Sequence, residues 1–379
     1  MNKNWIKKIG WISFLILFLI CLYFSFERIL YYDTSFHLFK IINFEKINIE
    51  ANRFSTFLTQ LPVLIAIKFQ LPLTSLIYIL SVTYLLIFFC IYLLILNISD
   101  NKFISLAFIL ILVANISKCF YFSSTETHQA LVYSTLTFTF LFAKFKNTIF
   151  YLILIMISIA LSFFSHPVAF FCIIYALGYY LIEKNKLYDG KIYFFALFAL
   201  LLVIAKLLFV KDNSYEGQFF NTLFFSHESW QNPNFFSIVF LWRNIVNLYW
   251  VNIIALIILL LVLKKHEKKL SLLYNLFALL FFLIITIITY QKGDADVMME
   301  RAYMPLSFFS ILPLFYELGK FDKFKKFLLY FFIIIFTISI VRISYCGLYL
   351  KKGLKSVDEV VYEAIQKNSC HGNYSMSVK

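Results

Sequence analysis

The chain has 379 residues, of which 62% are hydrophobic and 14% are charged, and its mean hydropathy is +0.83. A soluble domain is about half apolar and a quarter charged, so this composition excludes a soluble protein and indicates a polytopic membrane protein. The net charge of +14 lies in short lysine clusters between hydrophobic runs. Lysines at such positions set topology and contact anionic headgroups, so we expect membrane lipids and no nucleic acid as partners.

The hydrophobic runs are long and unbroken rather than alternating, which favours helices over a barrel. A helix needs about 20 residues to cross the hydrocarbon. The sequence therefore predicts an all-α fold with about eleven transmembrane helices, at residues 9–27, 72–97, 103–122, 127–144, 147–165, 167–183, 191–210, 244–263, 270–290, 302–318 and 326–346. The pairs that meet near Thr125 and His166 could each be one bent helix.

The first apolar run resembles a signal peptide but lacks a small-residue cleavage site, so we expect it to remain as the first span. Residues 31–71 then form the first outer loop. If its start is helical, Asp33 and His37 share one face, one turn apart. Residues 55–71 are interrupted by Pro62 and carry Gln60 and Lys68, which predicts an interfacial helix rather than a crossing.

Orientation follows from the basic connections. With the N-terminus cytoplasmic, alternate crossings place five later lysine-rich loops on the same side, which begin at Lys102, Lys144, Lys184, Lys264 and Lys320. Residues 211–243 then form a second outer loop, and residues 351–379 form a short outer tail after a transmembrane domain of residues 1–350. Cys346 and Cys370 flank this tail and could pair in an oxidising compartment. The expected location is the inner membrane of a bacterium.

The potentially reactive side chains collect on the outer side of this topology. They are Asp33, His37, Glu126, His128, His166, Arg243, Glu300 and Arg301. A guanidinium at this depth suits a phosphate, which it grips through two hydrogen bonds, although Arg301 could equally pair with Glu300 and reach the headgroups. Glu126 and His128 could simply cap a helix, and His166 before a proline is typical of a helix end. No spacing gives a metal-ligand set, so a divalent cation stays open as a cofactor.

Asp33 directly after the first span, an interfacial helix next, and acidic and basic groups in later outer loops together resemble the C-type (GT-C fold) glycosyltransferases. The pattern is closest to bacterial members related to the protein mannosyltransferases that use dolichyl-phosphate-mannose and to the lipid A arabinose transferases. The segments YYDTSFHLFKIIN and NRFSTFLTQLPVLIAIKFQLPL are also similar to a group of Bacteroidetes membrane proteins. Many of those transferases carry two acids in this loop, whereas Asp33 has no acidic neighbour.

This resemblance implies inverting transfer of a sugar from a polyprenyl-phosphate donor to a glycan, lipid or protein acceptor outside the membrane. Asp33 would be the general base that takes the proton of the acceptor hydroxyl. Arg243 or Arg301 would offset the charge of the leaving phosphate. His37, Glu126 and His128 would orient the acceptor or the base.

Two other functions fit the same pattern. A polymerase or ligase of the O-antigen type also joins lipid-linked glycans at the outer face and would use the loop at residues 211–243. A transporter or flippase predicts ionisable residues in mid-membrane and broken helices. The predicted spans are nearly free of charge at their centres, which favours the transferase.

Overall fold

The computed structural model describes residues 3–30, 33–50, 53–123, 125–145, 147–209, 236–290 and 294–370, and within these ranges the chain is helical with no strand. In chain order the elements are α1 (Lys3–Tyr23), α2 (Ser25–Leu30), α3 (Asp33–Phe44), η1 (Phe54–Thr56), α4 (Phe57–Lys68), α5 (Leu73–Ile98), α6 (Phe103–Val113), η2 (Lys118–Tyr121), α7 (Glu126–Phe142), α8 (Thr148–Phe163), α9 (Ala169–Glu183), α10 (Gly190–Phe209), α13 (Phe236–Asn244), η3 (Ile245–Tyr249), α14 (Trp250–Lys265), α15 (Lys269–Thr289), α16 (Asp296–Tyr303), α17 (Leu306–Gly319), η4 (Asp322–Phe324) and α18 (Lys325–Cys370).

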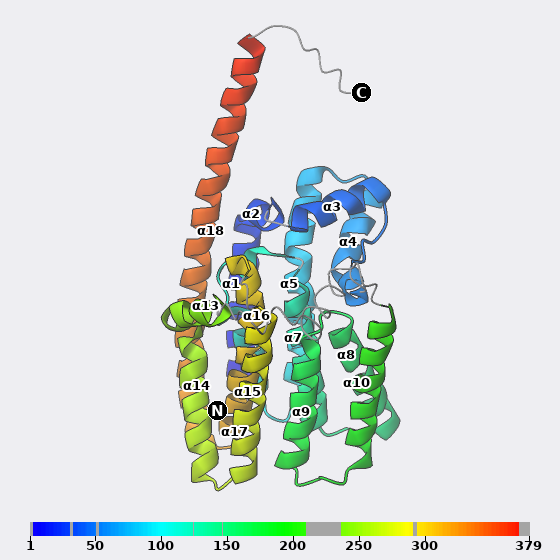
Figure 1. Ribbon diagram of the computed structural model, residues 1–379, viewed down its shortest axis with the longest axis vertical. Coiled ribbons are helices and arrows are strands. Elements are labelled where there is room, and N and C mark those ends of the chain that lie inside the picture. Colours follow the sequence, from blue (N-terminus) through cyan, green and yellow to red (C-terminus); the bar gives the residue numbers. More distant parts are fainter. Residues whose placement is uncertain are drawn as a thin grey trace.

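Most of these helices run along the long axis of one bundle (Figure 1). In the described part, five stretches are long and apolar enough to cross a membrane, namely Asn4–Tyr23, Leu73–Ile98, Phe236–Lys265, Lys269–Thr289 and Asp322–Ser356. These stretches fit an integral membrane protein. Each of the eleven predicted ranges contains a helix, but several of these helices are shorter than 18 residues. Eleven crossings therefore stay a prediction.

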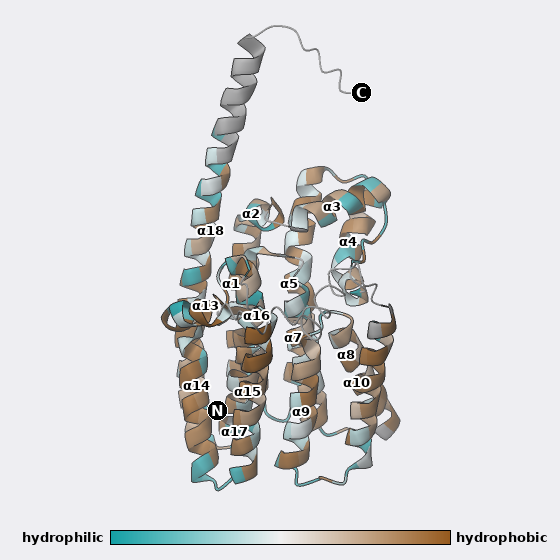
Figure 2. Ribbon diagram, viewed as in Figure 1, coloured by the Kyte–Doolittle hydropathy of each residue, from teal (hydrophilic) through white to brown (hydrophobic). Residues whose placement is uncertain are grey.

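The bundle is apolar on its outside as well as in its interior. Figure 2 shows hydrophobic residues along the outer faces of α14, α15 and α10, with hydrophilic residues concentrated at the connections. Large side chains such as Phe277, Leu201 and Tyr345 are exposed there. The centre is formed by α6, α7 and α17, whose residues are almost all buried. An apolar exterior of this kind is the surface that hydrocarbon covers.

The basic connections meet at one end of the bundle, which we call the basic end. Lys268 binds both Glu183 (2.7 Å) and Glu317 (2.8 Å), and Lys320 binds the same two carboxylates at 2.6 and 3.0 Å. These four side chains link the ends of α9 and α17 to the start of α15. The lysine-rich loops therefore share one end, as the orientation rule requires, and which side of a membrane this end faces stays a prediction.

The helices α6 and α7 fold back on each other and are not one bent helix. Lys144, just after α7, pairs with Asp100, just before α6, at 3.6 Å. The helices α8 and α9 also form a hairpin, because Lys184 at the end of α9 lies over Phe142 at the end of α7, close to where α8 begins. The α6–α7 and α8–α9 turns lie below α2 and α3 in the view of Figure 1.

The described residues between 33 and 71 contain two short helices, α3 and α4. α3 lies across the bundle axis (Figure 1) and exposes Phe36, Phe39 and Phe44. α4 has 12 residues and is about 18 Å long, too short to cross the hydrocarbon. It packs against α5, and its expected place in the membrane interface stays a prediction. α4 ends where Gln70 adopts a left-handed backbone (φ 55°).

The C-terminal region is one continuous helix up to Cys370 rather than a short separate helix. α18 has 46 residues and is about 69 Å long, so it extends beyond the rest of the bundle (Figure 1). Cys346 is buried and free. It lies 24 residues before Cys370 in the same helix, which separates the two by about 36 Å. The pairing that the sequence left open is therefore excluded, because a disulfide needs Cα atoms about 4–7 Å apart.

Candidate functional site

A buried ion cluster lies at the start of α7. The carboxylate of Glu126 pairs with the guanidinium groups of Arg53 (3.0 Å) and Arg301 (2.8 Å), and the three side chains are only 8%, 12% and 10% exposed. The Arg301 guanidinium also lies over the ring of Phe122, 5.0 Å from its centroid. Two guanidinium groups therefore face one carboxylate in the Arg53–Glu126–Arg301 cluster.

Local structure brings each member of the cluster to this place. Arg53 precedes η1, which is tied to the α8–α9 turn by hydrogen bonds between Ser55 and Phe164 (3.3 Å) and between Ser55 and Ser165 (2.6 Å). Glu126 is in the first turn of α7, where the helix dipole favours a negative charge. The expectation that Glu126 is only a capping residue is therefore too narrow, because its side chain binds two arginines.

Glu300 has a different partner from the one expected for it. Its carboxylate accepts hydrogen bonds from the backbone N–H groups of Ser117 (3.0 Å), Lys118 (3.3 Å) and Cys119 (2.9 Å). It is therefore not paired with Arg301, the next residue of α16. The side chains of Glu300 and Arg301 point to different elements, and Glu300 docks α16 on η2 while Arg301 reaches Glu126.

Two further arginines donate hydrogen bonds to backbone carbonyl groups of the connection between α6 and α7. The Arg342 guanidinium, from α18, donates to the backbone oxygens of Val113 (3.2 Å), Ala114 (2.6 Å) and Ile116 (3.1 Å). Arg28, from α2, donates to the backbone oxygen of Phe120. Non-helical backbone at membrane depth is stable only when its polar groups are paired inside the protein. These contacts explain why α6 ends at Val113, whereas the sequence predicted a helix up to residue 122.

The predicted histidines are not all part of the cluster. His166 lies in the α8–α9 turn, where its Nδ1 accepts from the backbone N–H of Val168 (3.2 Å) and its ring is near enough to Arg53 and Arg301 to feel their charge. His128 lies on the opposite face of α7 from Glu126 and packs near Tyr84 and Phe88 of α5. His166 is thus near both arginines of the cluster, whereas His128 is within range of the Arg301 charge but turns its ring toward α5.

His37 holds the segment that follows α3. Asn48 bridges His37 and Glu50, since its side-chain nitrogen is 2.7 Å from Nδ1 of His37 and 3.1 Å from Oε1 of Glu50. Lys40 also binds Glu50 at 2.9 Å. Burial alone would raise the pKa of Glu50, but the hydrogen bonds from Lys40 and Asn48 and the nearby charges of His37 and Lys40 hold that pKa below its ordinary value.

α3 begins at Asp33, so the helical spacing expected for Asp33 and His37 is confirmed. The side chain of Asp33 lies outside the described residues, as does most of the predicted outer loop at residues 211–243. Arg243 is exposed on α13 and does not belong to the ion cluster. Among the residues described, no three His, Cys, Asp or Glu side chains lie close enough together to hold a metal ion.

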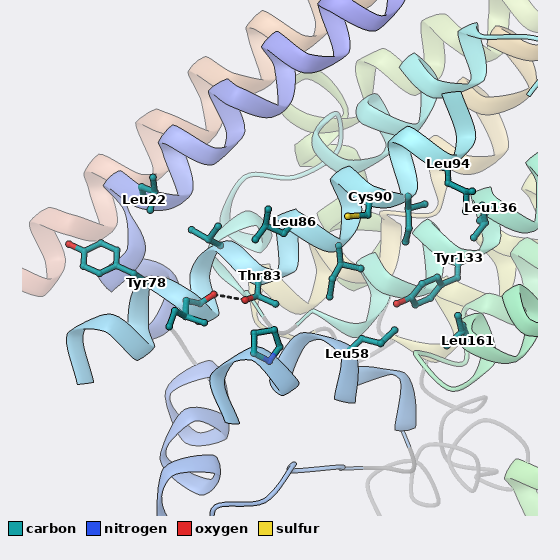
Figure 3. A pocket seen from close by; sticks show the side chains of 15 residues that line it. Leu22, Leu58, Tyr78, Thr83, Leu86, Cys90, Leu94, Tyr133, Leu136 and Leu161 are labelled. Carbon is teal, nitrogen blue, oxygen red and sulfur yellow. Dashed lines mark hydrogen bonds between the residues drawn. The ribbon is translucent and has the colours of Figure 1, made fainter. Parts of the chain in front are cut away.

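An apolar groove of about 850 Å³ runs along α5, between α5 and α4 (Figure 3). Its lining is almost entirely hydrocarbon and includes Leu58 and Pro62 of α4, Leu86 of α5, Tyr133 of α7 and Leu161 of α8. Leu86, like Tyr78 and Leu94 farther along the groove, is more than one-third exposed, so the groove opens sideways on the apolar exterior. One wall belongs to α7, the helix that begins with Glu126.

Sequence reasoning missed Arg53, Arg342 and Arg28. A signal existed for two of them. Arg53 is the only arginine between residues 31 and 71, and Arg342 interrupts the last apolar run. An arginine within such a run is rare unless it binds backbone carbonyls or another charge.

The chain was compared with protein families, curated proteins and solved structures. No family model matches it, and no curated protein or solved structure is similar to it at a significant level.

Proposed function

We propose that this protein is a membrane glycosyltransferase that moves a sugar from a polyprenyl-phosphate donor to a lipid-linked or cell-envelope acceptor on the outer side of a bacterial inner membrane. One observation carries the proposal: a buried cluster of two arginines and one glutamate shares α7 with a groove lined by hydrocarbon. A substrate that suits both surfaces has a long apolar chain and an anionic group, as a polyprenyl-phosphate sugar has.

The proposed chemistry is an inverting displacement. Asp33 takes the proton of the acceptor hydroxyl while the acceptor oxygen forms a bond to C1 of the sugar. The bond from C1 to the phosphate oxygen breaks, and its electron pair stays with the leaving polyprenyl phosphate. That phosphate gains negative charge as it leaves, and the guanidinium groups of Arg53 and Arg301 stabilise this charge by electrostatic attraction.

The test uses cells that lack the protein and are complemented with the wild type, Asp33→Asn, Arg301→Gln or Arg243→Gln. Membrane levels are matched, and the surface and lipid-linked glycans are compared by mass spectrometry. We expect the wild type and Arg243→Gln to restore a missing sugar, since Arg243 is exposed and apart from the cluster. Restoration by Asp33→Asn as well would rule out Asp33 as the base.

A second candidate, a flippase or transporter, gains support from one observation. α6 is about 16 Å long, half the thickness of the hydrocarbon, and the α6–α7 connection contains only the short 3-10 helix η2. Discontinuous helices with ionisable groups at their ends are typical of transporters. Here Arg342 and Glu300 of the chain itself cover those ends, which favours a fixed scaffold. A flippase would move a lipid-linked glycan across sealed vesicles with its mass unchanged, whereas a transferase changes that mass.

A polymerase or ligase of the O-antigen type stays as a further alternative. It would join whole repeat units, so its loss would shorten or detach a polymer. The glycan masses from the same cells distinguish this result from the loss of a single sugar.

A further inference from the structure

Two polar side chains of α7, one of which lines the groove, have no hydrogen-bond partner within the described chain. They are the Tyr133 hydroxyl and the Gln129 side-chain amide, whose oxygen and nitrogen are both unpaired, and the two residues are 2% and 1% exposed. A buried polar group without a partner costs roughly 1–3 kcal/mol. Such groups call for a bound molecule that satisfies them.

The helical repeat places both side chains between the groove and the ion cluster. Glu126, Gln129, Tyr133 and Leu136 follow one another at spacings of three or four residues, so they share one face of α7. Tyr133 and Leu136 line the groove, while Glu126 belongs to the cluster. The ring of Tyr133 is turned into the groove beside Leu58 and Leu161 (Figure 3). From Leu136 to Glu126 the face thus changes from apolar to hydrogen-bonding to charged over about 15 Å.

We propose that Gln129 and Tyr133 hydrogen-bond the phosphate oxygens of a lipid whose chain lies in this groove, and so distinguish a lipid phosphate from the corresponding alcohol. The inference rests on the proposed function, because it takes the lipid to be the polyprenyl-phosphate part of the donor. The phenol donates one hydrogen bond and the amide up to two, which suits the unbridged oxygens of a phosphate. The Arg301 guanidinium, at the start of the same helix face, is a cation that attracts an anionic group.

The chain supplies matched controls on the same helix. Thr127 and Ser134 are also buried and their hydroxyl oxygens have no partner among the described residues. Both lie roughly 80–100° around α7 from Glu126, away from the face that carries Gln129 and Tyr133. Thr127→Val therefore removes an equally buried unpaired hydroxyl from α7 without touching the proposed site.

The experiment measures binding to the full chain in detergent micelles by the shift in thermal unfolding that each ligand causes. The probes are polyprenyl phosphate, polyprenol of the same chain length and inorganic phosphate. We expect Tyr133→Phe and Gln129→Leu each to bind polyprenyl phosphate about tenfold more weakly than the wild type, the loss expected for one hydrogen bond to a charged group. Polyprenol should bind all variants alike, and Thr127→Val should match the wild type.

The stability of the ligand-free variants separates a binding role from a structural one. Removing an unpaired polar group should leave ligand-free Tyr133→Phe and Gln129→Leu at least as stable as the wild type. Earlier unfolding of both variants without ligand would overturn the inference, because the groups would then be paired within the fold. Unchanged affinity for polyprenyl phosphate, or equally tight binding of inorganic phosphate alone, would also overturn it.

The outcomes are independent of the test of the transferase. If the lipid results are as expected but Asp33→Asn restores the glycan, the proposed catalytic role fails and the lipid-phosphate site stands. If the glycan depends on Asp33 and the two variants bind polyprenyl phosphate normally, only the present inference fails.

Discussion

Replacement of Glu126 by glutamine tests the ion cluster most directly. The change removes one negative charge and leaves Arg53 and Arg301 facing each other in a site where the three side chains are 8–12% exposed. Removal of one partner from a buried ion pair typically costs about 3–5 kcal/mol, because the remaining charge is neither hydrated nor neutralised. Here two guanidinium groups lose the same partner, so we expect a loss of unfolding free energy in that range.

The assay is a denaturant titration of the purified protein in detergent micelles, followed by tryptophan fluorescence. The matched control is Asp100→Asn, which breaks the Asp100–Lys144 pair, whose side chains are 59% and 90% exposed. Such an exposed pair contributes at most about 1 kcal/mol. The double variant Glu126→Gln/Arg53→Gln should recover part of the loss, since it removes one of the two like charges that face each other in Glu126→Gln.

A Glu126→Gln variant as stable as Asp100→Asn would refute this reasoning. It would mean that water already hydrates the arginines or that an anion already neutralises their charge. A double variant that is less stable than Glu126→Gln would also contradict it, because Arg53 would then stabilise the fold through contacts other than the ion pair.

Three further predictions concern the connections and the tail. Glu267 adopts a left-handed backbone (φ 57°) after α14, so Glu267→Gly should raise the unfolding free energy by about 0.5–1 kcal/mol. A loss of stability would contradict the left-handed conformation of Glu267. The pKa of Glu50 is lowered in the folded protein. The contribution of its carboxylate to the free energy of unfolding is therefore complete above the unfolded pKa of about 4.3 and is lost as the pH falls toward the folded value. Glu50→Gln should accordingly reduce the acid sensitivity of unfolding between about pH 5 and 3. Cys346 and Cys370 should form no intramolecular disulfide, and intact-mass measurement after thiol labelling should detect both as free thiols without a reductant.

The sequence by itself determined the helical class and the approximate position of most helices. α5 was predicted at residues 72–97 and lies at Leu73–Ile98, and α9 was predicted at 167–183 and lies at Ala169–Glu183. These boundaries are local, because a change from hydrocarbon to Pro, Lys or Asn ends an apolar run wherever the helix packs. The grouping of the basic loops at one end was also predictable, since charge is excluded from hydrocarbon along the whole chain.

Only the tertiary structure decided where α6 ends and which charges meet. Residues 114–122 are mostly apolar, and the interruptions at Asn115, Ser117 and Lys118 do not by themselves fix Val113 as the last helical residue. Arg342 and Glu300, each more than 180 residues later, bind the backbone of the connection and replace its helical hydrogen bonds. The Arg53–Glu126–Arg301 cluster likewise joins three segments whose contact no spacing reveals. A buried charge is stable only beside its partner, and the partner's place is a property of the packed helices.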